Sequence, residues 1–532
     1  MTQPYEFITW SDTPNSNPLE VEVLTFDSGT KAEAIAANSF VVIDDAIQHR
    51  SWFGQVVSPQ LNIVRGLQKD NPNSISALER VLSGTAEDTV FLEQYRYYRI
   101  KLIGEITQGF LESVRVRPRY GAKGRRATTS EVTDFIRFPE LIGINTLNNV
   151  LGIIKDSDIP ICIDKKRIFY HALLAGATGA GKSNTIGNIV KASQALGMAS
   201  IIIDHKPDYQ DMHRSNTEAH LFGGFDDSMF APFALEKVKY FCLYTNDDHQ
   251  KQDKEIAISI RAGDASHDML ATALFYRSGE ELQREAFFSM LGHFRENLKE
   301  KNKSPGAWTL KDFEQWVNSH RTYKETQKEG TKSDWSKLAE YFNGETPNEK
   351  VIGAMLNRVA TRKPTWMDTT SGAKTSAPQT GVFKGLTPEP ITYFDPLAHL
   401  EPGGVLVIRR PQSSGAREYG LFLSYLLQRV YDLRRLNKIQ FHVTTVIDEA
   451  QDIFSGDALL KSASERVINE TLRKGRSKGM GFVIAVQSAS QLPNTILTNL
   501  NTRIIHRQNS EDELRYAIPG VPKDMLQQFS IE

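Results

Sequence analysis

Residues 18 to about 145 show the alternation of apolar and polar positions that is typical of short β-strands. Turn residues separate the strands, and one short helix is predicted at 74–82. The predicted strands are 20–26, 39–45, 52–58, 98–106 and 112–118. Several short strands at this spacing predict a small barrel or sandwich, which we assign to an N-terminal domain over residues 1–145.

From about residue 146 the pattern changes to nearly continuous apolar strands that alternate with helices. The predicted strands are 171–176, 199–204, 403–410, 442–450 and 481–488, and a helix is predicted at 182–196. Strands that are apolar on both faces belong to a parallel sheet covered by helices on both sides. We therefore predict an α/β domain over residues 146–532.

A helical insert is predicted within this domain, at about 265–362. One helix places Leu282, Ala286, Met290 and Phe294 on a single stripe, with two further apolar residues beside it. Thr309 is expected to cap another helix, with the side chain of Asp312 reaching back. We interpret these stripes as packing surfaces.

The segment from 176 to 183, GATGAGKS, fits the pattern G-x-x-x-x-G-K-[ST] between a predicted strand and a predicted helix. Backbone N–H groups of such a loop surround phosphates, Lys182 contacts the outer phosphates, and the Ser183 hydroxyl binds Mg²⁺. The predicted nucleotide-binding residues are Gly176, Ala177, Thr178, Gly179, Ala180, Gly181, Lys182, Ser183 and Asn184.

Asp448 and Glu449 follow an apolar strand and complete the predicted site. Asp448 is expected to hold the Mg²⁺ shell, and Glu449 to polarise the attacking water. An adjacent Asp and Glu at this place favours an ATP-hydrolysing enzyme over a nucleotide kinase or a small GTPase. An L-S-G-G-Q-like stretch is missing before Asp448, and Gln440 stands where a guanine-binding N-K-x-D would have its acid. The class that fits is the RecA-like ring motor.

Two further polar features belong to this interpretation. Gln487 ends the next strand, where it either senses the γ-phosphate or is an ordinary surface residue. The basic run before that strand contains Arg473 and Arg476, among other cations. We predict that Arg476 acts on the ATP of a neighbouring subunit, with Arg473 as the alternative. A solvated helix end stabilised by the helix dipole is the other interpretation of this run.

Composition narrows the class of partner and compartment. The chain has 532 residues, a net charge of −1 and two distant cysteines. A disulfide framework is therefore not expected, and a cytoplasmic location is. Uninterrupted apolar stretches are too short to cross a membrane. A net charge close to zero does not by itself attract nucleic acid, so any DNA contact must come from local clusters of basic residues.

The motor core resembles the HerA-type ATPases of the HerA/FtsK group. The resemblance is carried by HALLAGATGAGKSNT, IIIDHKPDY, VIDEAQ, GRSKGMGFVIAVQSASQLP and NTRIIHR, in the family's order. It covers about residues 20–520, and it is loose in the β-rich region and the insert. It implies a RecA-like core, ATP with Mg²⁺, and a homo-hexamer that threads double-stranded DNA. The N-terminal region then resembles the family's small barrel.

The resemblance also implies a separately encoded partner. Archaeal relatives work with the NurA nuclease, and bacterial relatives with nuclease or NAD-hydrolysing sirtuin-type effectors in antiviral defence. We expect a bacterial defence subunit of this kind. The alternatives are an ATP-controlled scaffold that assembles an effector and a DNA end-processing motor in repair.

The predicted DNA-contact candidates follow two core strands: Lys206, Arg409, Arg410 and Arg417. The three arginines are equally compatible with structural ion pairs. Relatives commonly have a D-P-H-G-E-Y-like motif where this chain has DHKPDY, so no catalytic role is transferred to residues 204–209. A second basic stretch, 114–126, is expected to be either a solvated hairpin or a surface for DNA or a partner protein.

Overall fold

The computed structural model divides the chain into two compact units, which are described one at a time. The first comprises residues 1–142, 152–162 and 520–532, and the second comprises 143–151 and 163–519. The described residues are 6–11, 19–26, 35, 39–57, 61–64, 94–136, 150–153, 160–163, 168, 171–215, 233–243, 254–301, 306–326, 330–342, 345, 348–364, 366–368, 391–409, 416–454 and 458–519. The helix predicted at 74–82 lies outside them.

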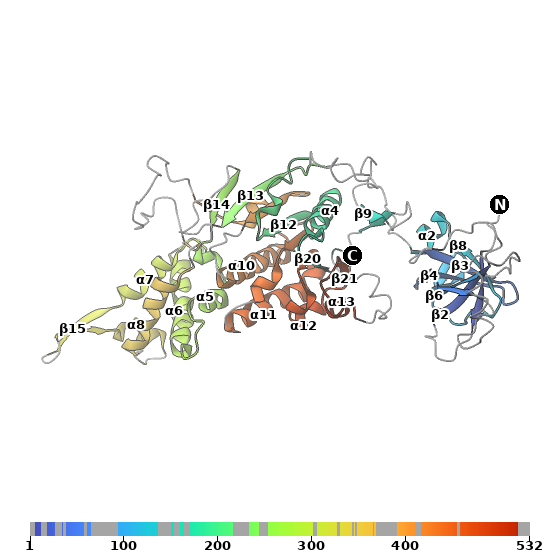
Figure 1. Cartoon of the computed structure of the whole chain (residues 1–532). Coiled ribbons are helices and arrows are strands. Elements are labelled where there is room, and N and C mark those ends of the chain that lie inside the picture. Colours follow the sequence, from blue (N-terminus) through green and yellow to red (C-terminus); the bar gives the residue numbers. More distant parts are fainter. Residues whose placement is uncertain are drawn as a thin grey trace, which may run out of the picture. The chain divides into compact units, whose positions relative to one another are not determined.

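The first unit contains a closed six-stranded β-barrel, which confirms the predicted barrel (Figure 1). Its strands follow the order β2-β1-β8-β3-β4-β6, and pairing of β2 with β6 closes it. The buried rings of Trp52 and Tyr98 belong to its core. The strands are β1 (Phe7–Ser11), β2 (Glu20–Phe26), β3 (Phe40–Asp45), β4 (Arg50–Val56), β5 (Leu61–Val64), β6 (Gln94–Thr107), β7 (Phe110–Glu112) and β8 (Lys123–Arg126), followed by helix α2 (Thr129–Ile136).

The strand predicted at 112–118 is wrong, and the first barrel strand was not predicted. Strand pairing ends at Glu112, the last residue of β7, and other contacts hold the segment that leads to β8. The indole Nε1 of Trp52 donates to the carbonyl of Val116 at 2.8 Å. The strand β1 is only five residues long, and its position becomes evident from its pairing with β2 and β8.

The basic stretch 114–126 is not a free hairpin. Arg119 pairs with the buried carboxylate of Asp45 at 3.0 Å, which lowers the pKa of Asp45 to about 2. Arg125 makes two hydrogen bonds to Glu131, at 2.8 and 2.7 Å. Arg126 pairs with Glu6 at 3.2 Å, and Arg115 with Glu112 at 3.5 Å. These acids neutralise most of the charge that the sequence suggested for a binding surface.

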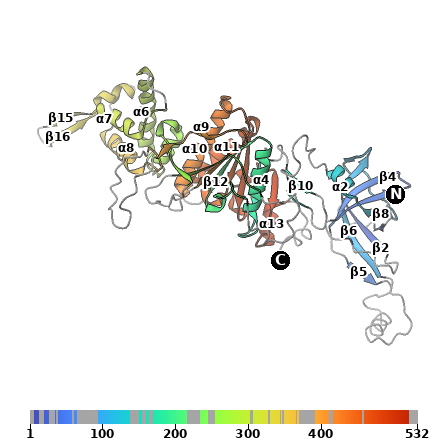
Figure 2. The same cartoon turned by 90° about the horizontal axis from the view of Figure 1, so that it is seen from above.

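The second unit is built on a nine-stranded, entirely parallel sheet, as the predicted RecA-like core requires. Its order is β17-β14-β13-β18-β12-β19-β20-β11-β21 (Figures 1 and 2). The strands are β11 (Ala172–Ala175), β12 (Ala199–Asp204), β13 (Val238–Leu243), β14 (Glu255–Ser259), β17 (Thr392–Tyr393), β18 (Val405–Arg409), β19 (Val443–Ile447), β20 (Met480–Val486) and β21 (Thr502–Ile505). Because all strands are parallel, their carboxyl ends meet at one edge.

Helices cover this sheet and form the insert. They are α4 (Lys182–Ala195), α5 (His267–Leu274), α6 (Glu281–Glu300), α7 (Leu310–Ser319), α8 (Glu349–Arg362), α9 (Pro396–His399), α10 (Ala416–Arg435), α11 (Ala458–Gly475), α12 (Asn494–Leu497) and α13 (Glu511–Ala517). A short two-stranded sheet, β9 (Val150–Ile153) with β10 (Pro160–Cys162), precedes them. No helix in the described ranges is long and apolar enough to span a bilayer.

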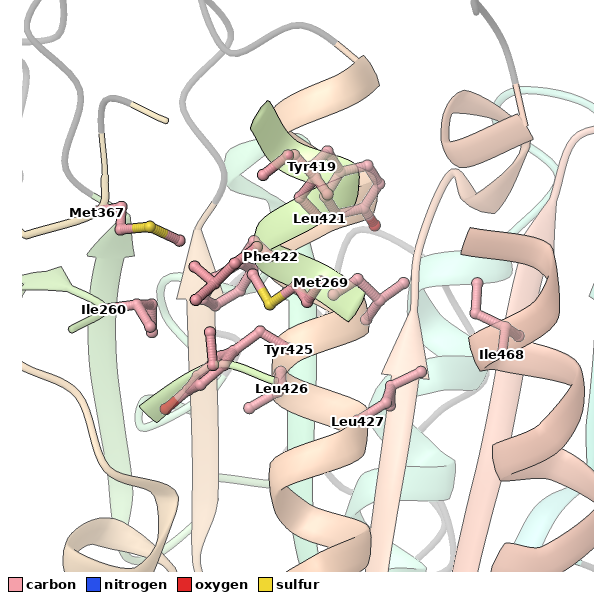
Figure 3. Close-up of a cluster of buried hydrophobic side chains, with 14 of the residues drawn as sticks. Ile260, Met269, Met367, Tyr419, Leu421, Phe422, Tyr425, Leu426, Leu427 and Ile468 are labelled. Carbon is pink, nitrogen blue, oxygen red and sulfur yellow. The ribbon is translucent and has the colours of Figure 1, made fainter. Parts of the chain in front are cut away.

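The insert shares its core with the ATPase sheet through α10. Figure 3 shows Met269 of α5, Phe422 of α10 and Ile468 of α11 within one buried cluster. The predicted stripe on α6 is correct for Ala286, Met290 and Phe294 but wrong for Leu282, which is 63% exposed. Leu282 lies at the first turn, beyond the packed part of the helix. The predicted capping box of Thr309 and Asp312 is present.

Within the insert, a hairpin not anticipated from the sequence projects beyond α7 and α8 in both views (Figures 1 and 2). It consists of β15 (Thr322–Thr326) and β16 (Gly330–Asp334), which pair antiparallel.

Arg409 was predicted as a DNA-contact candidate, and its environment contradicts that role. The residue ends β18 and is only 9% exposed. Its guanidinium reaches across β13 and makes two hydrogen bonds to the buried carboxylate of Glu255, at 2.6 and 2.8 Å. The alternative of a structural ion pair is therefore the correct one.

Replacing Arg409 by Ala should destabilise the second unit by about 3–5 kcal/mol, because the buried Glu255 carboxylate loses its partner. Arg435→Ala serves as the matched control, since Arg435 pairs with Asp432 at 3.3 Å on the surface; its expected cost is below about 1 kcal/mol. Chemical denaturation of both variants measures the difference. Equal effects would contradict a structural role for Arg409.

Candidate active site

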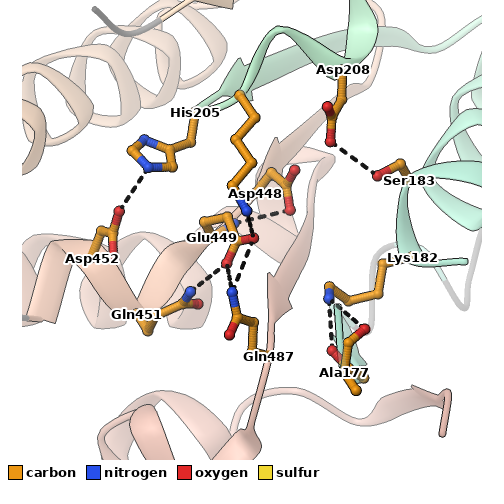
Figure 4. Close-up of polar contacts among 12 residues, drawn as sticks. Ala177, Lys182, Ser183, His205, Asp208, Asp448, Glu449, Gln451, Asp452 and Gln487 are labelled. Atoms are coloured by element: carbon orange, nitrogen blue, oxygen red, sulfur yellow. Dashed lines mark hydrogen bonds and ion pairs between the residues drawn. The ribbon is translucent and has the colours of Figure 1, made fainter. Parts of the chain in front are cut away.

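The phosphate loop connects the carboxyl end of β11 to the first turn of α4, as predicted. Gly179 and Gly181 have φ angles of 75° and 96°, a region that favours glycine. The ammonium of Lys182 donates to the loop carbonyls of Gly176 at 2.6 Å and Ala177 at 3.3 Å (Figure 4). Lys182 is therefore held inside the loop, where phosphate oxygens would replace these carbonyls as its partners.

The residues that follow β21 contact the phosphate loop, a feature that the sequence analysis did not identify. The amide of Ala177 donates to the carbonyl of Arg507 at 2.9 Å, and a nitrogen of the His506 ring lies 3.1 Å from Thr185 Oγ1. A Cβ added at Gly176 would meet the Cβ of His506 at 2.6 Å. Gly176 thus allows the close approach of β21 to the loop. The motif NTRIIHR gave the only sequence signal for this contact.

The carboxyl end of β19 places Asp448 and Glu449 opposite the loop. The hydroxyl of the buried Tyr209 donates to Asp448 at 3.0 Å. Burial raises the pKa of Asp448, and this hydrogen bond opposes the rise. Glu449 has a φ of 48°, a left-handed conformation that is uncommon for a residue with a side chain. This turn directs the two adjacent carboxylates to different partners.

The Glu449 carboxylate is the most heavily hydrogen-bonded group of the site (Figure 4). Lys206 Nζ lies 3.0 Å from one oxygen, and Gln487 Nε2 lies 3.1 Å from the other. Gln451 Nε2 donates to that second oxygen as well. Burial favours the neutral acid, but the hydrogen bonds from Lys206 and Gln451 outweigh burial, so the pKa of Glu449 is lowered. The expectation that Gln487 lies at the reaction centre agrees with this geometry.

A third carboxylate, Asp204, ends β12 next to this pair. It is fully buried, and within the described part of the chain no side chain donates a hydrogen bond to its oxygens. Burial raises its pKa to about 8, and the neighbouring charges of Asp448 and Asp208 add to the rise. Asp208 in turn faces Ser183 Oγ at 3.4 Å. Burial of a charged carboxylate is unfavourable, which is why Asp204 stays protonated to high pH.

These observations fit a nucleotide with Mg²⁺. Lys182 would neutralise phosphate charge, and Ser183 with Asp448 would hold the ion. The buried Asp204 carboxyl lies at the same sheet edge.

The predicted basic residues are distributed over both edges of the sheet. Lys206 contacts Glu449 and so lies in the active site. Arg476 begins a short 3₁₀ turn (Arg476–Lys478) that precedes β20, at the edge opposite the phosphate loop. Arg503 donates to the carbonyl of Ala517 and connects β21 to α13. Arg410 and the side chain of Arg417 lie outside the described residues.

Comparison with known proteins supports the resemblance. Residues 149–360 match the family model for the central domain of helicase HerA. A DNA double-strand break repair helicase HerA of Sulfolobus acidocaldarius is 21% identical over 463 residues, which cover 85% of this chain and 75% of that protein. The chain is thus similar to the HerA-type ATPases. The resemblance inferred from its motifs is thereby confirmed, as is ATP hydrolysis with Mg²⁺.

Two solved structures show a partial, low-scoring similarity to this chain. The bacterial conjugative coupling protein TrwBdeltaN70 is 16% identical, covers 73% of this chain and 77% of its own, and has a TM-score of 0.41. VirB4 of Thermoanaerobacter pseudethanolicus is 14% identical, covers 71% and 90%, and also has a TM-score of 0.41. Similarities at this level support no conclusion about the site.

Glu449→Gln should preserve ATP binding and reduce hydrolysis by about 10²–10⁴-fold, because the amide cannot accept the proton of the attacking water. Lys182→Ala should abolish hydrolysis through loss of phosphate contacts. The matched control is Glu470→Gln, which changes an exposed acid paired with Lys474 at 3.5 Å. Single-turnover hydrolysis and equilibrium ATP binding measure the two effects. Fast turnover by Glu449→Gln would exclude Glu449 as the base.

Asp204→Asn should stabilise the Mg²⁺-free protein increasingly between about pH 4 and pH 8. The folded wild type keeps Asp204 protonated up to about pH 8, whereas the unfolded chain ionises near its ordinary value. Wild-type stability therefore falls across this window, by up to about 1.4 kcal/mol per pH unit from this group, and the variant avoids the loss.

The measurement is the difference in urea unfolding midpoint between variant and wild type, in EDTA, from pH 5 to pH 9. Asp211→Asn is the control, since Asp211 is exposed and pairs with Arg214 at 3.5 Å. A pH-independent difference for Asp204→Asn would show that Asp204 is not protonated in the fold.

Proposed function

We propose that the chain is the subunit of a hexameric, ATP-driven DNA translocase in which each ATP site is completed by the next subunit. The observation that carries this proposal is the placement of Arg476 and Gln487 at opposite ends of β20. Seven residues of strand separate the two edges by roughly 20 Å. Arg476 is therefore directed away from its own phosphate loop, and a ring arrangement brings such a residue to the neighbouring site.

The residues of the site divide the hydrolysis among them. Lys182 would neutralise charge on the outer phosphates, and Ser183 with Asp448 would hold the Mg²⁺. Glu449 accepts a proton from the attacking water molecule. The water oxygen then bonds to the γ-phosphorus, while the bond between this phosphorus and the leaving ADP oxygen breaks. Gln487 orients Glu449, to which it is already hydrogen-bonded. The neighbour's Arg476 would stabilise the charge that develops during phosphoryl transfer.

Duplex DNA is the proposed track. The named relative is a DNA repair helicase, and duplex DNA offers about one charge per 1.7 Å to basic loops in a ring. The strands β12 and β18 end at the sheet edge where open α/β domains place functional loops. We expect non-specific binding, because phosphate contacts carry no sequence information.

The proposed cellular role rests on the family resemblance. The motor would act in the cytoplasm with a separately encoded nuclease or sirtuin-type effector in bacterial antiviral defence. A repair motor that processes DNA ends is the nearest alternative. An ATP-controlled scaffold for the effector is another, and it predicts ATPase activity that does not depend on DNA.

ATPase rate with and without duplex DNA tests the translocase proposal against the scaffold. We expect stimulation by DNA that falls steeply with salt, because binding releases counterions. The same assay is repeated with the product of the neighbouring gene. Rates that respond to the effector but not to DNA would favour the scaffold.

Arg476→Ala should retain ATP affinity but lose about 10³-fold or more in ATPase rate, the range known for arginine fingers. Mixed rings of Arg476→Ala and Lys182→Ala subunits should regain activity, because some interfaces then combine an intact Lys182 with an intact Arg476. Arg473→Ala is the matched control on the preceding helix. Mixed rings that assemble without rescue would place Arg476 in cis or in a structural role.

A further inference from the structure

Lys206 links two segments of the active site that are far apart in the sequence. It directly follows His205 after β12 and precedes the 3₁₀ turn Pro207–Tyr209. Its ammonium lies 3.0 Å from the Glu449 carboxylate, although 243 residues separate the two in the chain. Tyr209, three residues further on, donates to Asp448. One short segment therefore contacts both members of the Asp-Glu pair.

The contacts of Glu449 restrain it as a base. Lys206 Nζ lies 3.0 Å from one oxygen, which the Gln487 amide also contacts at a longer 3.4 Å. The amides of Gln451 and Gln487 donate to the other oxygen. A general base needs a free oxygen directed at the water it deprotonates. Withdrawal of Lys206 would leave that oxygen with only the longer contact to Gln487, so that a water molecule could reach it.

Lys206 is accessible to a competing anion, whereas Glu449 is not. The lysine side chain is 45% exposed, and the glutamate side chain is 9% exposed. An exposed ammonium exchanges partners readily, because the ion pair contributes little net free energy at a solvated site. Phosphates of duplex DNA offer closely spaced negative charges to such a group.

We propose that Lys206 holds Glu449 back until a DNA phosphate takes the lysine, so that DNA binding releases the catalytic base. This inference rests on the proposed translocase function and assigns its regulation to one residue. The segment DHKPDY, which departs from the motif of its relatives, thus couples DNA binding to ATP hydrolysis. ATP hydrolysis in the absence of DNA would be suppressed by the same contact.

The test compares steady-state ATPase rates of the full chain for wild type, Lys206→Met and Lys206→Arg, each with and without duplex DNA. Lys206→Met removes the charge at similar length and should raise the DNA-free rate about fivefold, the scale of a partly exposed ion pair. Further stimulation by DNA should disappear, with the KM for ATP unchanged. Lys206→Arg keeps a cation at this position and should retain the stimulation by DNA that Lys206→Met loses.

Lys239→Met is the matched control, because Lys239 is similarly exposed and pairs with Glu401 at 3.1 Å away from the site. A DNA-free rate for Lys206→Met at or below that of wild type would overturn the inference and assign Lys206 a direct part in hydrolysis. A raised rate with undiminished DNA stimulation would overturn the release by DNA. A wild type without DNA stimulation would overturn both this inference and the translocase proposal, whereas the first two outcomes leave the translocase intact.

Discussion

The carboxylate of Glu449 depends on hydrogen bonds from three separate segments, and the arrangement of the whole ATPase unit makes them meet. Lys206 follows β12, Gln487 follows β20, and β19 with Glu449 lies between them in the sheet. Parallel pairing brings these carboxyl ends to one edge. The left-handed turn at Glu449 then directs its side chain among the donors. A shift in any of the three strands would change the environment of the base.

The same strand direction separates the two ends of β20. Gln487 contacts Glu449 in the ATP site of its own subunit, whereas Arg476 lies at the opposite edge of the sheet. The buried pair of Arg409 with Glu255 connects β18 to β14 across β13. In the proposed ring, a change at an ATP site would act on the interface with the next subunit. DNA would then sense the state of that interface through loops at the carboxyl edge.

Local patterns explain why much of this fold could be predicted. The phosphate loop, the Asp448–Glu449 pair and the capping box of Thr309 depend on residues a few positions apart, so the sequence reveals them. Polar contacts between distant residues are different. Arg409 pairs with Glu255 at a sequence separation of 154 residues, and His506 contacts Thr185 at a separation of 321 residues. Charge alone cannot distinguish a DNA-binding arginine from a buried one, which is why the sequence left both interpretations open for Arg409.

The account is tested most directly by the structure of the assembled protein with duplex DNA, Mg²⁺ and an ATP analogue that cannot be hydrolysed between its β- and γ-phosphates. It predicts the guanidinium of Arg476 from one subunit at the γ-phosphate of its neighbour, and Lys206 displaced from Glu449. Arg476 remaining remote from every nucleotide, with Lys206 still on Glu449 while DNA is bound, would contradict it.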